Sequence, residues 1–219
     1  MIEPPKKSLI PLFELYNEFM KYFLPLIIAF SILINPLNTL AEELILAGGC
    51  FWCLEHDLES LKGITSVESG YSGGDLPNPT YRNHTGHQEV VEVTYESNKI
   101  SFDKLLRGYW RNIDPFDSRG QFCDRGESYK PAIFFMNENQ LYEAEVSLEK
   151  AAIELSVEKG EIGVGIYPAK TFWVAEDYHQ DFAKNNKIKY NFYRKSCGRD
   201  KRLDNVWGKN SRTTKEWQS

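Results

Sequence analysis

The sequence predicts one α/β domain with two layers, in which helices pack on a mixed sheet. Three observations predict it: short apolar or alternating runs typical of strands, runs with helical spacing between them, and glycine-rich breaks where they end. The expected strands cover residues 43–47, 64–71, 89–95, 130–136 and 162–166. Their alternation with helices favours two layers and leaves the order of the strands in the sheet open.

The expected helices lie between and after these strands, at residues 50–61, 101–112, 137–155 and 176–184. Ser101 and Asn137 suit the start of a helix, and Gly63 suits the end of the first one. The polar stretches 72–88 and 114–129 are expected to be irregular. A loop as long as the first of these is often functional inside a compact domain.

Length and composition fit this single domain. The chain has 219 residues, of which 42% are hydrophobic, and this is enough to bury a sizeable core. The formal net charge is −5 and no basic stripe runs along the sequence, so nucleic acid is not an expected partner.

The first 41 residues are typical of a secretory signal peptide. The apolar run 23–34 is shorter than the roughly 20 residues of a membrane-spanning helix. The segment Thr39-Leu40-Ala41 is a small-residue cleavage site. Residues 1–21, which precede the apolar run, form a longer segment than the start of a signal peptide usually has, and their charges cancel. A start at Met20 would give a short basic segment instead. The alternative is an uncleaved membrane anchor formed by residues 23–34.

Cleavage would leave residues 42–208 as the main domain and residues 209–219 as a polar tail. We then expect an exported, periplasmic protein that is a monomer without stable membrane association. Export implies an oxidising compartment, where cysteine pairs can cycle or form structural disulfides.

Cys50 is the most informative residue because it lies between a Gly-Gly break and the start of a helix. Unpaired backbone N–H groups and the helix dipole are expected to lower its thiol pKa there. Cys53 follows on the same helix face, within disulfide reach. The pair favours redox chemistry over two small buried side chains. Zinc binding is disfavoured, because Cys123 and Cys197 are isolated.

Two aromatic residues follow the first cysteine. Phe51 continues the apolar stripe of the helix, whereas Trp52 lies off that stripe and can face a pocket. Aromatic rings beside a reactive thiol would suit a methyl or thioether group. The alternative for both residues is ordinary core packing.

Glu89 is placed by the alternation of its strand. It shares one face with Val91 and Val93, while Glu92 and Glu96 lie on the other face and are expected to be solvated. A carboxyl group at the mouth of an apolar site has a raised pKa and can donate a proton. From the alternation alone, the alternative is a strand-end carboxylate in solvent.

Taken together, the motifs resemble the peptide methionine sulfoxide reductase A family. Residues 48–52 (GGCFW) contain the signature GCFW, and the resemblance covers roughly residues 43–208. Further matches are GYSGG (70–74), NPTY (78–81), TGHQE (85–89), WRNIDPFD (110–117), QFCDRGESY (121–129) and AEDYHQDF (175–182). So many ordered matches are more specific than any single motif.

The resemblance implies a ferredoxin-like fold and the reduction of methionine S-sulfoxide, free or in proteins, as a repair after oxidative stress. Cys50 would be the redox-active nucleophile that becomes a sulfenic acid, and Glu89 would protonate the sulfoxide oxygen. Neither a metal nor an organic cofactor is implied. An external dithiol reductant, such as a thioredoxin-type protein, would restore the enzyme.

The resemblance also implies roles for five further residues. Tyr81 and Tyr129 match hydroxyl groups that bind the sulfoxide oxygen. Phe51 and Trp52 match the pocket for the methyl group of the substrate. Asp124 matches a polar residue of the catalytic site.

The recycling cysteine is the point at which the chain departs from the family pattern. Some members carry two recycling cysteines in a glycine-rich tail, whereas this chain has one late cysteine, Cys197, and adds Cys53. We favour Cys197 slightly as the resolving thiol, since Ser196 and Gly198 flank it near a polar end. Cys53 is held nearly equal, and a relay through both stays open. A third candidate, Cys123, is expected to be buried and structural.

Two other functions compete with this interpretation. One is a thioredoxin-like thiol–disulfide oxidoreductase with Cys50 and Cys53 as its couple, which would need neither Glu89 nor the two tyrosines. The other is a secreted binding domain held by two disulfides, in which no thiol titrates.

Overall fold

The computed structural model describes residues 41–212. The predicted signal peptide, with the alternative anchor at 23–34, lies outside the described residues apart from Ala41, and so does the end of the polar tail. No helix within residues 41–212 is both long and apolar enough to cross a membrane.

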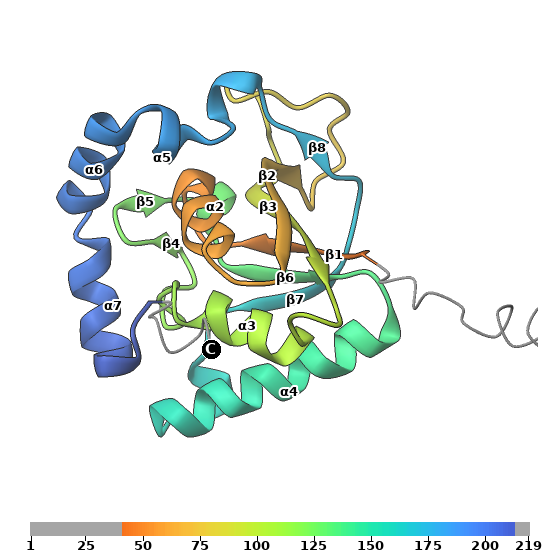
Figure 1. Ribbon diagram of the computed structural model, residues 1–219, viewed down its shortest axis with the longest axis vertical. Helices are drawn as coiled ribbons and strands as arrows, with labels where there is room; N and C mark the ends of the chain where they lie inside the picture. The colour runs from red at the N-terminus through yellow and green to blue at the C-terminus, as the bar shows by residue number, and fades with distance from the viewer. Residues whose placement is uncertain (1–40, 213–219) are drawn as a thin grey trace, which may run out of the picture. The chain divides into compact units, whose positions relative to one another are not determined.

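The described residues form a six-stranded sheet with helices packed on it (Figure 1). Its strands are β1 (Ala41–Ala47), β2 (Ile64–Ser72), β3 (Gln88–Glu96), β6 (Ala132–Phe135), β7 (Gly165–Pro168) and β8 (Trp173–Val174). Their order is β7-β6-β1-β3-β2-β8, and only the β6–β7 pair is parallel. The central order β6-β1-β3-β2 is the ferredoxin-like arrangement, and the predicted class of a mixed sheet with packed helices is confirmed.

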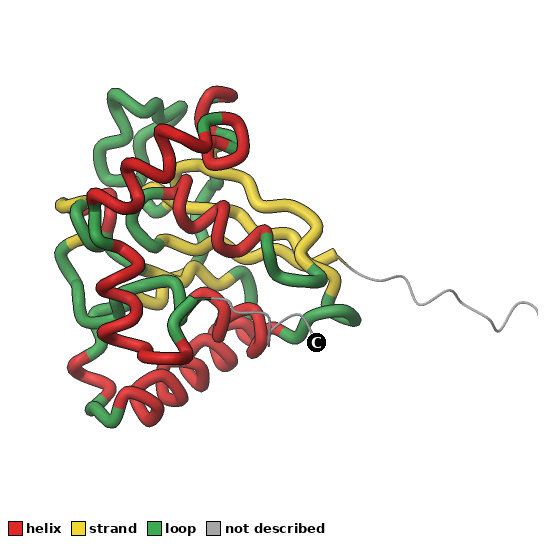
Figure 2. Tube along the Cα trace, turned by 60° about the vertical axis from the view of Figure 1, so that its left-hand side comes forward, coloured by secondary structure: helices red, strands yellow, loops and turns green. Residues whose placement is uncertain are grey.

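Three predicted helices cover one face of the sheet (Figures 1 and 2). They are α2 (Phe51–Glu59), α3 (Phe102–Trp110) and α4 (Glu138–Leu155). The Ser101 hydroxyl accepts the N–H of Lys104 at 3.2 Å, and the Asn137 side chain accepts the N–H of Gln140 at 3.0 Å. Both predicted helix starts are therefore capped by the expected residues.

The main core lies between these helices and the sheet. Its fully buried residues include Leu44, Leu46, Leu54, Leu58, Val91, Val93, Leu105 and Leu106. Glu89 is 2% exposed, as its alternation with Val91 predicts. The opposite face of β3 is not solvated as expected: Val90 is buried beneath Phe172, and Glu92 is half-buried. The connection between β7 and β8 covers this second face.

The C-terminal third differs most from the sequence prediction. The predicted last strand at 162–166 is β7, which begins at Gly165, and β8 follows it and pairs with β2. The predicted helix at 176–184 is a 3₁₀ turn (Asp177–His179) followed by the short helix α5 (Phe182–Asn185). Asp181 separates them because its φ of 52° is left-handed.

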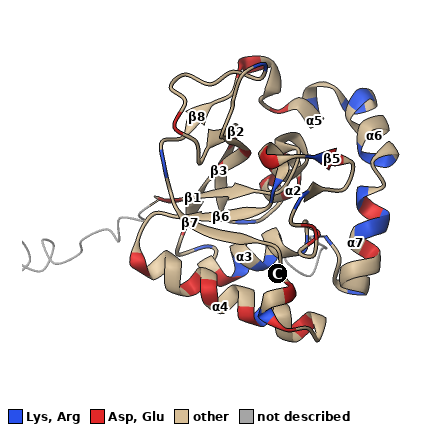
Figure 3. Cartoon of the chain, turned by 180° about the vertical axis from the view of Figure 1, so that it is seen from behind, with Lys and Arg blue, Asp and Glu red and all other residues tan. Residues whose placement is uncertain are grey.

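Two further helices, α6 (Lys187–Ser196) and α7 (Arg199–Trp207), were not predicted. Within α6, Tyr190 and Arg194 are the buried residues, so an apolar stripe is missing. Lys, Arg, Asp and Glu residues occur along both helices (Figure 3). The stretch 114–129 also contains a small hairpin, β4 (Gly120–Gln121) and β5 (Asp124–Arg125).

Candidate active site

The turn between β1 and α2 determines where Cys50 lies. Gly49 has a φ of +81°, and a Cβ atom there would lie 2.6 Å from Cβ of Gln121, so the position requires glycine. Cys50 is the N-cap residue of α2, and its side chain makes no capping hydrogen bond. Its side chain is buried, with 5% exposure. The thiol is therefore free to interact with groups of the site.

Glu89 reaches the same helix start from β3. The backbone N–H of Phe51 donates to Oε2 of Glu89 at 3.2 Å. This N–H belongs to the first turn of α2, where backbone donors have no partner inside the helix. Burial, reinforced by the Asp124 carboxylate, raises the pKa of Glu89 to about 8 despite that hydrogen bond. The carboxyl group therefore holds its proton at neutral pH, as the sequence predicts.

The two predicted tyrosines lie near Glu89. Tyr129 forms a hydrogen bond with the Glu89 side chain. Tyr81 is 41% exposed, and its ring centroid lies 4.6 Å from that of His179. Burial and the Glu89 charge raise the pKa of both phenols. Both hydroxyl groups therefore remain protonated, as hydrogen-bond donors.

Aromatic rings form a wall beside Cys50. The Trp52 ring stacks on Phe182 with centroids 3.8 Å apart, and its Nε1–H donates to Nδ1 of His179 at 3.0 Å. The Phe51 and His179 centroids are 4.9 Å apart. Trp52 is partly exposed, whereas Phe51 is buried. Phe51 and Trp52 thus lie in one aromatic group that begins directly after the thiol.

Cys50 and Cys53 are both free thiols, and both are buried. Burial, the hydrogen bond with Cys53 and the nearby Glu89 raise the pKa of Cys50 well above its usual range. The predicted lowering is therefore wrong, because burial outweighs the helix start. The pKa of Cys53 is lowered by its hydrogen bond with Cys50 and by the Arg199 and Arg194 charges.

The two arginines come from the unpredicted C-terminal helices. Arg194 forms an ion pair with Asp57 at 2.9 Å, and Asp57 lies one helical turn after Cys53. Arg199 is 1% exposed and donates to the carbonyl of Asn112 at 2.7 Å. The guanidinium groups of Arg194 and Arg199 thus place positive charge near Cys53 of α2. In the sequence, the basic residues around Cys197 were the feature that could have indicated this charge.

Asp124 is held by a residue that was not predicted from the sequence, Tyr193 of α6. The Tyr193 hydroxyl donates to Oδ2 of Asp124 at 2.6 Å. Tyr193 also packs against the buried cluster of Cys50 and Cys53, and its hydroxyl acts to lower the pKa of the Cys50 thiol. Burial raises the pKa of Asp124, although Tyr193 and two arginines act against it.

Cys123 and Cys197 are joined in a disulfide, with Cα atoms 4.9 Å apart. Cys123 is exposed at the turn of the β4–β5 hairpin, so the expectation of a buried residue is wrong. Cys197 is therefore bonded in this structure, whereas Cys53 is a free thiol beside Cys50. Asp124 lies within 4.8 Å of both sulfurs, but two bonded sulfurs do not offer thiolate ligands to a metal.

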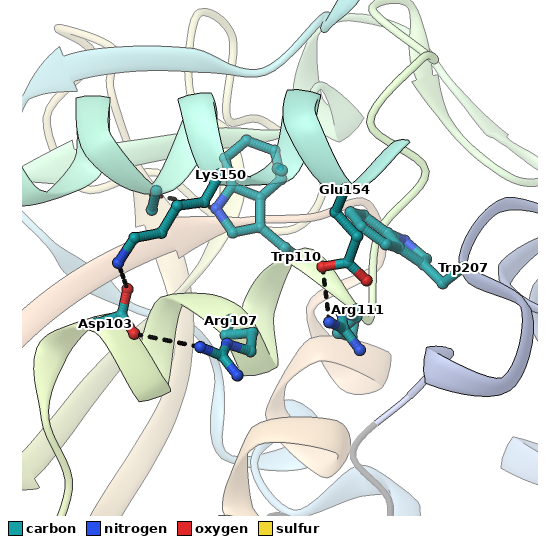
Figure 4. A pocket seen from close by; sticks show the side chains of 9 residues that line it. Asp103, Arg107, Trp110, Arg111, Lys150, Glu154 and Trp207 are labelled. Carbon is teal, nitrogen blue, oxygen red and sulfur yellow. Dashed lines mark hydrogen bonds and ion pairs between the residues drawn. The ribbon is translucent and has the colours of Figure 1, made fainter. Parts of the chain in front are cut away.

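A separate cavity of about 280 Å³ lies between α3 and α4 (Figure 4). Its charged side chains pair with one another: Lys150 with Asp103 at 2.5 Å and Arg111 with Glu154 at 2.7 Å. None of the predicted site residues lines this cavity. The candidate site therefore lies elsewhere, at the start of α2.

Two thiols one helical turn apart, a protonated carboxyl group and tyrosine hydroxyls define a thiol-dependent oxidoreductase. Residues 42–211 match the family model described as peptide methionine sulfoxide reductase. The chain belongs to this family, whose members reduce methionine sulfoxide and so repair oxidised proteins. The thioredoxin-like alternative is not favoured.

Individual relatives agree with the family match. The chain is 52% identical to the peptide methionine sulfoxide reductase MsrA 2 of Caulobacter vibrioides, over 76% of this chain and 86% of that one. It is 46% identical to MsrA of Bacillus licheniformis, over 74% of this chain and 92% of that one.

Two solved structures share the fold. Methionine sulfoxide reductase A of Corynebacterium diphtheriae superposes with a TM-score of 0.62 at 30% identity, over 68% of this chain and 76% of that one. Reduced Mxr1 of Saccharomyces cerevisiae gives 0.60 at 28% identity, over 67% and 86% of the two chains.

Proposed function

We propose that the protein reduces methionine S-sulfoxide, free or in proteins, through a sulfenic acid at Cys50. The observation that carries the proposal is the position of Glu89 at the start of α2, where its carboxyl group accepts the N–H of Phe51, the residue directly after Cys50. A sulfoxide sulfur is a weak electrophile, and its oxygen leaves only after it is protonated. A carboxyl group that keeps its proton at neutral pH supplies that proton.

In the proposed first step, the methyl group of the substrate packs against Phe51 and Trp52. Tyr81 and Tyr129 donate hydrogen bonds to the sulfoxide oxygen. The Cys50 sulfur attacks the sulfoxide sulfur, the oxygen takes a proton from Glu89, and the oxygen passes to the cysteine. Methionine leaves, and Cys50 is oxidised by two electrons to a sulfenic acid.

In the proposed second step, Cys53 resolves the sulfenic acid. Its lowered pKa and its hydrogen bond with Cys50 support this role. The attack forms a disulfide between Cys50 and Cys53 and releases the oxygen as water. An external dithiol protein of the thioredoxin type would then reduce this disulfide by thiol–disulfide exchange. The chemistry requires no metal or organic cofactor.

The test is turnover of a racemic methyl sulfoxide with a dithiol reductant, followed by chiral chromatography of the remaining substrate. We expect only the S epimer to disappear, since the family uses one enzyme for each epimer. Cys50→Ser should be inactive, because a serine hydroxyl is a much weaker nucleophile than a cysteine sulfur and cannot form a sulfenic acid. Equal loss of both epimers, or near-normal turnover by the Cys50→Ser variant, would contradict the proposal.

We also propose that the enzyme acts outside the cytoplasm, as a periplasmic monomer. The apolar run 23–34 and the small residues before Glu42 support export with cleavage after Ala41. The N-terminal sequence of the protein isolated from its host tests the cleavage site. An intact N-terminus in the membrane fraction would favour the anchor instead.

A further inference from the structure

We infer that Tyr193 is a further catalytic residue, which passes the proton of the Cys50 thiol to Asp124 before the sulfur attacks the sulfoxide. The inference deepens the proposed function and rests on it, because it concerns the same first step. Neither Tyr193 nor a base for Cys50 follows from the sequence motifs.

The position of the Tyr193 hydroxyl carries the inference. It lies 2.6 Å from Oδ2 of Asp124, and Tyr193 packs against the buried cluster that contains Cys50. A phenol has one proton to donate and lone pairs to accept another. The thiol proton can therefore move to the phenol oxygen while the phenol proton moves to Asp124, and Tyr193 ends the step unchanged.

The state of Cys50 explains why the step is needed. The thiolate is the nucleophile, yet burial holds the resting cysteine in its thiol form. A buried thiol cannot give its proton directly to bulk water, so it needs an internal acceptor. The titratable groups that face it are Cys53, Glu89, Tyr193, Tyr81 and Tyr129, and Glu89 already carries its own proton.

Asp124 is suited to receive the proton. It faces Tyr193 from α6, Arg199 from α7 and Arg125 from its own hairpin. Across the site it faces Glu89, Tyr81 and Tyr129. The two arginines and Tyr193 favour its charged form, whereas Glu89 stays protonated up to a pKa of about 8. A carboxyl group that keeps its proton beside one whose charged form is supported by neighbouring cations is suited to act as the acid while the other acts as the base.

The step balances in protons and electrons. The S–H bond of Cys50 breaks, and its proton goes to Asp124. The sulfoxide S–O bond breaks, a new S–O bond forms on Cys50, and Glu89 protonates that oxygen. Cys50 is oxidised by two electrons and the sulfoxide is reduced by two. Asp124 ends protonated and Glu89 ionised, so the charge of the site is unchanged.

The surrounding structure holds the three groups in place. Cys123 precedes Asp124 in the hairpin, and Cys197 caps the C-terminus of α6, four residues after Tyr193. The disulfide between these cysteines therefore joins the two segments that carry the proposed base and the proposed proton carrier. Trp52 also packs edge-on against Tyr193, with ring centroids 6.0 Å apart. The cysteines of this disulfide are positioning residues.

Tyr193→Phe tests the inference, because it keeps the ring and removes the hydroxyl. The rate of the first turnover should fall about 10²-fold near neutral pH, the lower end of the usual contribution of proton transfer. Tyr190→Phe is the matched control. Tyr190 lies on the same helix, is more deeply buried than Tyr193 and accepts a hydrogen bond from Arg194. Its first turnover should stay close to that of the wild type.

A second readout separates proton transfer from a loss of structure. Alkylation of Cys50 by iodoacetamide, followed by mass spectrometry in a Cys53→Ser background, reports the thiolate without any need for Glu89. Tyr193→Phe and Asp124→Asn should both require a higher pH for alkylation. A structural defect alone would not move that pH dependence. The double variant should be no slower than the slower single variant, because the two residues act as a unit.

The outcomes distinguish this inference from the proposed function. Loss of the first turnover in Cys50→Ser together with a wild-type rate and alkylation profile in Tyr193→Phe would overturn the inference alone. Loss of the first turnover in Cys53→Ser would also overturn it, by identifying Cys53 as the base. Continued turnover by Cys50→Ser would overturn the proposed function itself. A slow Tyr193→Phe with a shifted alkylation profile, beside a normal Tyr190→Phe, supports the inference.

Discussion

The four cysteines form two pairs that differ in burial, partners and state. Cys50 and Cys53 are free and buried on one helix, in contact with ionisable groups of three other segments. Cys123 and Cys197 are bonded across a sequence separation of 74, and Cys123 is exposed. The difference teaches that the surroundings of a cysteine pair determine its chemistry. Glu89 and Tyr193 lie beside the first pair, where they can transfer protons to and from a substrate.

The second pair contributes through what it joins. It connects the hairpin that carries Asp124 to the helix that carries Tyr193 and Arg194. These side chains meet Cys50 and Asp57 in the buried part of the site. The buried pair is therefore expected to react, and the surface pair to hold the reacting groups. Each prediction below tests one side of this division.

The largest effect is expected from Cys53→Ser. Without a resolving thiol, each enzyme molecule should reduce one sulfoxide and then stop with Cys50 as a sulfenic acid. Single-turnover and multiple-turnover assays, with mass analysis of the trapped cysteine, measure this. Normal recycling by a dithiol protein would show that Cys197 resolves the sulfenic acid after all, and the division between the pairs would fail.

The next effect concerns the carboxyl group that faces the buried pair. Glu89→Gln should slow the first turnover by about 10²–10⁴-fold, because an amide cannot donate the proton that the oxygen needs. Glu92→Gln is the control, since Glu92 lies on the opposite face of the same strand and is half-buried. An equal loss of first-turnover rate in Glu89→Gln and Glu92→Gln would contradict a catalytic role that depends on the face of β3 on which Glu89 lies.

Much of the fold could be predicted because its first half has strong periodicity. The stripe of Phe51, Leu54 and Leu58 on α2 and the alternation around Val91 on β3 are local patterns, and both are buried as predicted. The helices α6 and α7 lack such a stripe. Ion pairs such as Arg194–Asp57 hold them, and partners so distant in sequence leave no local pattern.

The site follows the same division. Cys50 and Glu89 could be recognised because a glycine break and an alternating strand mark their positions. Tyr193 lies on an unpredicted helix, and its contact with Asp124 joins residues 69 positions apart. The pKa of Cys50 was predicted in the wrong direction because the helix start is a local feature, whereas burial depends on the whole fold.

The pH dependence of the first turnover sharpens the comparison further. The pKa of Glu89 is raised to about 8, so the required acid form dominates below that pH and is lost above it. The rate should therefore fall about tenfold for each pH unit above this value. Rapid-quench measurements across this range test it, and the limb should vanish in Glu89→Gln. If the rate of Glu89→Gln still falls above pH 8, the fall reflects the ionisation of a group other than Glu89.

The smallest effect on activity is expected from removing the surface disulfide with Cys123→Ser and Cys197→Ser together. The cross-link closes a long loop, and its loss should lower the free energy of unfolding by about 2–4 kcal/mol. For a domain of this size, that corresponds to a fall in Tm of roughly 4–16 °C. Calorimetry of the variant and of the wild type measures the change.

The first turnover of this double variant should fall only a few-fold. The hydrogen bond of Tyr193 to Asp124 and the ion pair of Arg194 with Asp57 still hold α6 against the site without the cross-link. The alkaline limb near pH 8 should also stay in place, because Glu89 does not contact the disulfide. A loss as complete as that of Cys50→Ser, in a variant that remains folded at the assay temperature, would show that the surface pair takes part in the chemistry. The division into a pair that reacts, Cys50 and Cys53, and a pair that only stabilises the site, Cys123 and Cys197, would then be wrong.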